Sequence, residues 1–145
     1  MALAKLVKEI DNAEASGQLS RPCISYAEAI RLPYLVVSIK EGMRIHPSVG
    51  YSLPRHVPPE GAAISGRYFK AGTRVGVSAH IMHRDKGVFG EDADVFNPDR
   101  WLREGASSMD RYVLSFGAGT RICLGKNVSS LSEQLESVLT RARSL

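Results

Sequence analysis

Apolar residues recur with a helical period near both ends of the chain. In the first segment they are Leu3, Leu6, Val7 and Ile10. This spacing predicts an amphipathic helix that ends near Gly17. Beyond Gly125 the same spacing returns at Val128, Leu131, Leu135, Val138 and Leu139. It predicts a second amphipathic helix that runs up to the C-terminus.

Helix-start signals divide residues 25–47. Ser25 and Glu28 have the spacing of a capping box, which predicts a short helix after Ser25. Pro33 suits the first turn of a longer helix, and the dipeptide His46-Pro47 ends it. The apolar side of that longer helix carries Leu35, Ile39 and Met43.

The middle of the chain has no helical pattern of apolar residues. Between Val49 and Ser78, short runs of β-favouring residues alternate with proline and glycine, which predicts three or four short strands. Residues 87–119 are rich in charge, glycine and proline and have no sustained period, so we expect an irregular, ordered loop there. The fold class predicted is α+β, mainly helical with a small β-sheet.

Composition and charge narrow the class of protein. The 145 residues are 43% hydrophobic and 23% charged, which suits one folded domain. Because no apolar run could cross a bilayer and the first residues lack the features of a secretory signal, we expect no membrane anchor in this chain. The net charge of +4 is mild, and Lys/Arg runs interleaved with aromatic residues are lacking, so we do not expect nucleic-acid binding.

The two cysteines have different surroundings. Cys23 and Cys123 form no CxxC pair and no zinc spacing, which argues against a disulfide framework or a zinc module. Cys23 lies in a linker-like stretch, whereas Cys123 lies in a glycine-rich segment just before a predicted helix. A buried structural cysteine in a turn is the alternative for Cys123. A thiolate near a helix N-terminus is favoured by the dipole, and cysteinate is a ligand of haem iron.

The ten residues that end at Gly125 read FGAGTRICLG. The aromatic residue, the glycines, the arginine and the cysteine of this segment could each have a role in binding haem. Gly119 and Gly125 leave room for a flat macrocycle near the backbone, Arg121 can pair with a propionate, and Phe116 can exclude water from the sulfur. The segment resembles the haem-binding signature Phe-x-x-Gly-x-Arg-x-Cys-x-Gly of cytochrome P450, with every fixed position matched. The resemblance implies haem b as cofactor, with Cys123 as its metal ligand through an axial thiolate.

Glu41 and Arg44 lie three residues apart on the helix predicted after Pro33, so their side chains share a face and can pair. Glu28 and Arg31 have the same spacing. The spacing alone therefore does not separate a functional pair from a solvated one.

The surroundings of Glu41 and Arg44 add to the resemblance. Residues 45–47, Ile-His-Pro, are similar to the end of the P450 helix that bears the Glu-x-x-Arg motif, and residues 96–101, FNPDRW, are similar to the loop that carries a second arginine. The resemblance implies a buried structural network of Glu41, Arg44 and Arg100. Its expected role is to hold the cysteine loop in place.

Three further residues carry side chains that could bind a cofactor or a metal. Arg55 lies where the family often has a strand arginine that reaches a haem propionate, and an exposed strand-end arginine is the alternative. His80 and His83 have a spacing that metal ligands can use. Because the triplet that begins at His83 resembles a structural turn of the family, we assign no metal ligation to either histidine.

The motifs occur in the order of the C-terminal third of the P450 fold, and the resemblance covers nearly the whole chain. The sequence around residues 89–102 is most similar to a fungal branch of the family, the pisatin demethylase-like proteins. Residues 1–145 are thus interpreted as one C-terminal haem-binding portion of a P450 domain, without its distal helix and N-terminal region. We expect a truncated product or a partial gene model.

For the intact enzyme, the resemblance implies insertion of one oxygen atom from O₂ into a small organic substrate. It also implies electrons from a flavoprotein of the NADPH–cytochrome P450 reductase type and a location on the cytosolic face of the endoplasmic reticulum membrane. The alternative hypothesis is a truncated, non-catalytic fragment that binds haem or a partner protein.

Overall fold

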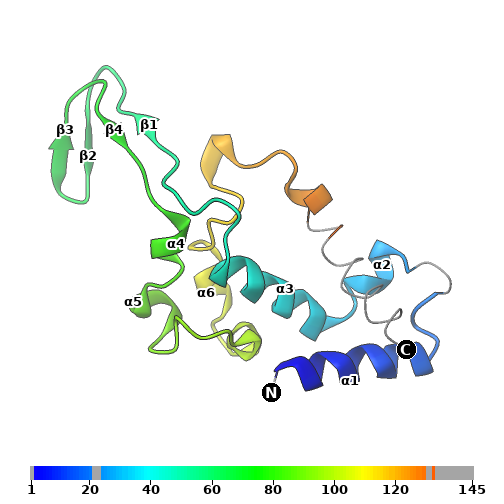
Figure 1. Cartoon of the computed structure of the whole chain (residues 1–145). Coiled ribbons are helices and arrows are strands. Elements are labelled where there is room, and N and C mark those ends of the chain that lie inside the picture. Colours follow the sequence, from blue (N-terminus) through cyan, green and yellow to red (C-terminus); the bar gives the residue numbers. More distant parts are fainter. Residues whose placement is uncertain (1, 21–23, 130–131, 133–145) are drawn as a thin grey trace.

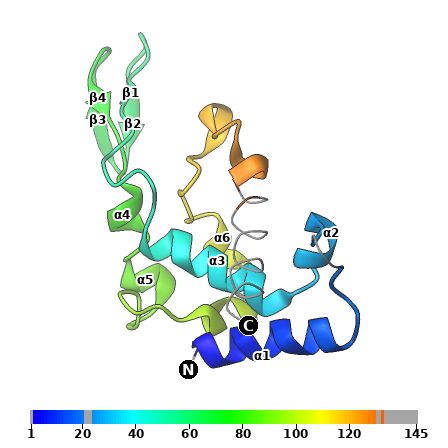
Figure 2. The same cartoon turned by 45° about the vertical axis from the view of Figure 1, so that its right-hand side comes forward.

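The computed structural model describes residues 2–20, 24–129 and 132, and a central helix organises them (Figure 1). The first three helices are α1 (Ala2–Ala15), α2 (Tyr26–Ala29) and α3 (Pro33–Ile45). Their positions confirm the helices predicted from apolar spacing, and Ser25 and Glu28 form the predicted capping box. Helix α3 lies between α1 on one side and the later, shorter helices on the other (Figures 1 and 2).

The α1–α3 core joins the first helices. Its buried members are Ile10, Ala13, Leu19, Ala29, Leu32 and Leu35. The Glu9 carboxylate on α1 also accepts the backbone N–H groups of Tyr34 and Leu35, each at 2.8 Å. The first amides of a helix have no partner within it, so α1 both packs against α3 and caps its N-terminus.

The C-terminus of α3 is capped by side chains from distant segments. Its last carbonyl groups lack partners within the helix. The donors are Ser115 Oγ to the Met43 oxygen (3.1 Å), His83 Nδ1 to the Arg44 oxygen (2.9 Å) and Arg84 Nη2 to the Ile45 oxygen (2.9 Å). Helix α3 is therefore anchored at both ends by residues that are remote in sequence.

The predicted strands are confirmed as a narrow β-arm that projects beside α4 (Figure 1). The strands are β1 (Arg55–His56), β2 (Ala62–Ile64), β3 (Arg67–Phe69) and β4 (Arg74–Val75). They form two antiparallel pairs, β1 with β4 and β2 with β3. Ser65 and Gly66 join β2 to β3 with positive φ angles of 49° and 76°, as the tightest hairpin turns require.

The region expected to be an irregular loop contains single helical turns. After α4 (Ala79–Met82) these turns are α5 (Lys86–Phe89), η1 (Pro98–Leu102), α6 (Ser107–Asp110) and η2 (Gly119–Arg121). Each is too short to give a periodic apolar pattern, which is why the sequence pattern did not predict them. Phe89, Ala93 and Trp101 form a second cluster, the Trp101 core, against this segment.

The last helix is only partly described. Residues 126–129 are helical, so the helix predicted beyond Gly125 begins where expected. Its predicted positions Leu131, Leu135, Val138 and Leu139 lie outside the described residues, as does Cys23. Among the residues that the structure describes, no helix combines the length and apolar character needed to cross a bilayer.

Candidate cofactor site and its buried ion cluster

Glu41 on α3 is completely buried, and both of its carboxylate oxygens are used. Oε1 accepts from Arg44 Nη2 (2.8 Å), the Asn97 backbone N–H (2.9 Å) and Arg100 Nε (3.0 Å). Oε2 accepts from Arg44 Nε (2.9 Å) and Trp101 Nε1 (2.9 Å). The structure thus brings together Glu41, Arg44 and Arg100. We call these three residues, with Asp92, Asn97 and Trp101, the Glu41 cluster.

The charges of the Glu41 cluster balance. Burial alone would raise the pKa of Glu41, but hydrogen bonds from Arg44, the Asn97 amide and Trp101 outweigh it and hold the pKa below its usual value. On its other side, Arg100 pairs with the Asp92 carboxylate at 3.0 Å. Two guanidinium groups therefore face two carboxylates. A buried ion pair is tolerated when each charge has such partners.

The two arginines also bind the backbone of the following segment. Arg44 donates from Nη1 to the carbonyl oxygens of His83 (2.5 Å) and Ala93 (2.6 Å). Arg100 donates to the carbonyl oxygens of Phe89 and Asp92. The planar guanidinium can serve several acceptors at once, so the Glu41 cluster ties α3 to residues 83–95.

Sequence reasoning missed three members of this cluster. Trp101 stands in the sequence only as the last residue of the FNPDRW motif, although a buried indole N–H usually needs an acceptor, and that need is a usable signal. Asp92 lies in an acidic stretch whose neighbours gave no reason to single it out. The Asn97 contribution is a backbone amide, which no side-chain pattern can indicate.

The Glu28 and Arg31 pair, which has the same spacing, is used differently. Ser20 Oγ and Ser25 Oγ donate to Glu28 at 2.6 and 2.7 Å. The Ser20 hydroxyl, the Ser25 backbone N–H and the Ser25 hydroxyl, in that order, lower the pKa of Glu28 to about 2. Arg31 is exposed. Glu28 is therefore the third helical residue of the capping box that begins at Ser25, and it does not act as Glu41 does despite the same spacing to an arginine.

Cys123 lies on a tightly turned loop and is exposed. Its backbone N–H donates to the Phe116 carbonyl oxygen at 2.8 Å, which closes the loop between the two residues. Within it, Gly117 and Gly119 have φ angles of +75° and +68°. Side chains rarely adopt this left-handed conformation, so glycine at both positions lets the loop close.

The surroundings of the Cys123 sulfur fit the group that the resemblance implies. A Cβ on Gly125 would lie 3.8 Å from Sγ, and one on Gly119 would meet no atom within 4 Å. A Cβ on Gly119 would therefore stand in open space, whereas one on Gly125 would be in van der Waals contact with the sulfur. Arg121 is exposed, and Leu124 is fully exposed. An exposed thiol, an exposed apolar side chain and an exposed guanidinium suit a flat, apolar macrocycle with acidic edges.

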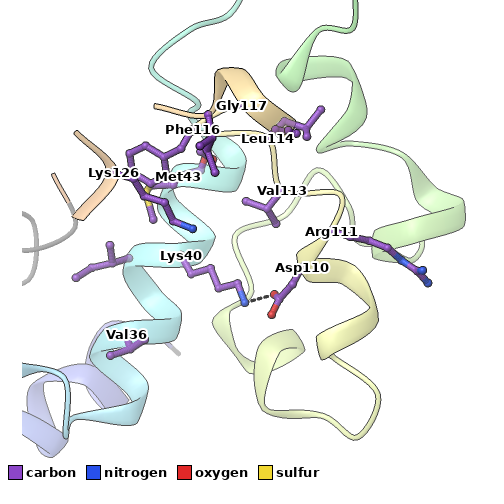
Figure 3. Close-up of a pocket in the computed structure, with 15 residues that line it drawn as sticks. Val36, Lys40, Met43, Asp110, Arg111, Val113, Leu114, Phe116, Gly117 and Lys126 are labelled. Carbon is purple, nitrogen blue, oxygen red and sulfur yellow. Dashed lines mark hydrogen bonds and ion pairs between the residues drawn. The ribbon is translucent and has the colours of Figure 1, made fainter. Parts of the chain in front are cut away.

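Phe116 lines a pocket of about 510 Å³ between α3 and the Cys123 loop (Figure 3). Val36 and Met43 contribute from α3, and Val113 faces them from the segment before the loop. An ion pair between Lys40 and Asp110 lies at the same pocket. The Phe116 side chain therefore forms part of the wall of this pocket, on the α3 side of the Cys123 loop.

Arg55 and the two histidines lie outside the Cys123 loop. Arg55 is exposed on β1 and donates to the Pro54 carbonyl oxygen at 3.0 Å. The β-arm that carries it lies apart from the Cys123 loop in both views (Figures 1 and 2). His80 is exposed beside Arg84, whereas His83 is completely buried and uses both ring nitrogens in hydrogen bonds to the backbone.

The family model and the similar proteins all point to one family. The family model for cytochrome P450 matches residues 2–140. A cytochrome P450 monooxygenase, ACRTS1 of Alternaria alternata, is 46% identical over 88% of this chain and 34% of its own length. A cytochrome P450 monooxygenase of Aspergillus terreus is 46% identical over 89% of the chain and 27% of its length.

Pisatin demethylase of Fusarium vanettenii is 44% identical over 74% of this chain and 21% of its own length. This likeness confirms the predicted resemblance to a fungal branch of the family. The chain spans only about a third or less of these curated relatives. The structure, which combines helices with small antiparallel sheets, confirms the predicted α+β class and fits a fragment of the P450 domain. From the family-model match and these identities, the chain belongs to the cytochrome P450 family.

Proposed function

We propose that residues 1–145 form the haem-thiolate side of a cytochrome P450 monooxygenase, with Cys123 as the axial ligand of haem b. The observation that carries this proposal is the exposed Cys123 thiol on the closed glycine loop of a chain in this family. When bound, thiolate-ligated haem supplies the O₂ activation by which one oxygen atom is inserted into an organic substrate.

The chain's own residues have distinct tasks in this proposal. Cys123 supplies the sulfur, and the hydrogen bond from its amide to the Phe116 oxygen fixes where that sulfur lies. Gly119 and Gly125 keep the approach free of side chains, and Arg121 pairs with a propionate. Phe116 lines the pocket behind the loop, and we infer that it keeps water from the sulfur.

Two further residue groups support the site from a distance. The Glu41 cluster ties residues 83–101 to α3, and we infer that this support extends to the segment that leads into the Cys123 loop. Arg55 is a further propionate partner in this proposal, although the β-arm presents its side chain to solvent. Its role requires an approach of that arm to the haem edge.

The intact enzyme would need partners beyond this chain. We infer a small organic substrate and electrons from a flavoprotein of the NADPH–cytochrome P450 reductase type. The family location at the cytosolic face of the endoplasmic reticulum is part of the same proposal. The chain spans about a third or less of its relatives' length. A second candidate function is haem binding by this chain without turnover.

Haem reconstitution tests the proposal. The chain is loaded with haem, and the difference spectrum of the reduced carbon monoxide complex is recorded. We expect a red-shifted Soret band that Cys123→Ser abolishes and the matched control Cys23→Ser retains. A soluble, folded chain without this band would contradict ligation by Cys123. Product formation after adding reductase, NADPH and a substrate panel would exclude the non-catalytic alternative.

A further inference from the structure

His83 is a buried, titratable residue that the proposed function does not use. Its side chain is completely buried between the last turn of α3 and the segment that leads to the Cys123 loop. His83 Nδ1 lies 2.9 Å from the Arg44 carbonyl oxygen, and Nε2 lies 2.7 Å from the Leu114 backbone nitrogen. The two ring nitrogens thus join two chain segments that are remote in sequence.

The partners define the protonation state of the ring. A carbonyl oxygen only accepts, so Nδ1 carries the proton, and Nε2 must be unprotonated to accept the Leu114 N–H. The imidazole is therefore neutral. Burial, together with the positive charges of Arg44 and Arg84 and the nearby His80, holds the pKa of His83 below its usual value, in agreement with this geometry.

A short series of hydrogen bonds continues from Leu114 to Cys123. The Gly117 N–H donates to the Leu114 oxygen at 2.9 Å, and the Cys123 N–H donates to the Phe116 oxygen at 2.8 Å. Ser115 Oγ adds a second tie from this segment to α3, at the Met43 oxygen. The segment that holds the Cys123 amide is thus itself held by α3 through His83 and Ser115.

We propose that His83 is a positioning residue for Cys123. Its neutral imidazole fixes residues 114–117 against the last turn of α3, and residues 114–117 fix the backbone that carries the sulfur. The proposal rests on the proposed function, because the sulfur position matters most when Cys123 is the haem ligand. A histidine that only fills the core would affect overall stability without a specific effect at Cys123.

Two substitutions separate the two hydrogen bonds of the ring. In His83→Asn, the amide nitrogen takes the place of Nδ1 and keeps the bond to the Arg44 oxygen, but no atom replaces Nε2. In His83→Gln, the longer side chain brings its oxygen to the place of Nε2 and keeps an acceptor for Leu114. His56→Asn on the exposed strand β1 is the matched control.

The test is amide hydrogen exchange on the full chain without haem. We expect the Leu114 and Cys123 amides to exchange about 5- to 100-fold faster in His83→Asn, as loss of a buried acceptor implies. In His83→Gln and His56→Asn, both rates stay within about twofold of the unmodified chain. A second readout on the haem-loaded chain is the red-shifted carbon monoxide band, which His83→Asn weakens and His83→Gln restores.

Equal exchange at Cys123 in His83→Asn and His56→Asn would overturn the proposal, and so would equally fast exchange in the Asn and Gln variants. Where His83→Asn does not fold, His83→Gln decides, since exchange at Cys123 as fast as in an unfolded peptide is incompatible with the proposal. If the unmodified chain gives no thiolate band, the proposed function fails, while the exchange rates still decide the role of His83.

Discussion

Replacing Arg100 by methionine would expose how much the Glu41 cluster contributes to stability. Arg100→Met keeps most of the side-chain length but removes the guanidinium of a residue that is 1% exposed. Lost with it are the contacts to Glu41 Oε1 and Asp92 Oδ1, both at 3.0 Å, and the donors to the carbonyl oxygens of Phe89, Asp92 and Val95. Glu41 keeps its remaining donors but loses one of its two cations.

The size of the effect follows from burial. Breaking a buried ion pair by removing one partner costs about 3–5 kcal/mol, because the remaining charge and acceptors lie away from water. With a urea m-value of about 2 kcal/mol/M, the unfolding midpoint should fall by roughly 2 M. Arg100→Lys keeps the charge but not the forked geometry, so we expect a midpoint between those of Arg100→Met and the unmodified chain.

The molecule contains its own probe for this experiment. Trp101 is the only tryptophan in the sequence, and its indole nitrogen donates to Glu41 at 2.9 Å. Urea unfolding can therefore be followed by Trp101 fluorescence and, independently, by far-ultraviolet circular dichroism. The absence of a cooperative transition in Arg100→Met would mean that the loss exceeds the stability of the chain.

Lys5→Met is the matched control. Lys5 pairs with Asp99 at 2.7 Å, but both side chains are about half exposed, so water and salt screen the interaction. We expect its midpoint to stay close to that of the unmodified chain. A shift for Arg100→Met no larger than that for Lys5→Met would refute the argument that burial gives the cluster its strength.

Three further predictions concern protonation and packing. Because burial lowers the pKa of His83, the unfolded chain binds a proton near pH 6.5 that the folded chain does not. The free energy of unfolding should fall as the pH drops below about 6.5, and urea midpoints of His83→Gln should fall less steeply there. Removing the Ser20 hydroxyl in Ser20→Ala should raise the pKa of Glu28 from about 2 toward 4.5, measurable by NMR titration of the carboxyl carbon; an unchanged pKa would contradict the assigned cause. Leu35→Ala, at a completely buried site, should cost about 2–5 kcal/mol in urea unfolding. In the same assay, Leu124→Ala at a fully exposed site should change stability by less than about 0.5 kcal/mol, and similar losses for both would refute the packing assignment.

The sequence predicted the parts of the fold that repeat a pattern. Helices α1 and α3 follow from apolar spacing and from the start signal at Pro33, and the β-arm follows from alternating strand formers and turn residues. The single turns α5 and η1 did not follow, because one helical turn has no period to detect. Their positions depend instead on contacts such as those of Arg100 with the backbone.

For the candidate site, residue spacing and resemblance contributed differently. The pairing of Glu41 with Arg44 follows from helix geometry, but so would a pairing of Glu28 with Arg31, which the structure does not use. The contact of Glu41 with Arg100 spans 59 residues and was expected only through the family resemblance. The link from His83 to Leu114 joins a side chain to a backbone amide, and no pattern of residue types encodes it.

The capped C-terminus of α3 makes the β-arm a self-contained insertion. Ser78 Oγ bonds to the Gly50 oxygen at 3.2 Å, while Arg84 Nη2 reaches the Ile45 oxygen at 2.9 Å, so the chain leaves α3 and returns to it at one place. Closing a longer loop between fixed ends adds only about 0.6 kcal/mol for each doubling of its length. The tip of the arm at Ser65 and Gly66 is therefore free to vary in length and sequence during evolution, while the framework around Glu41 and Cys123 keeps its geometry.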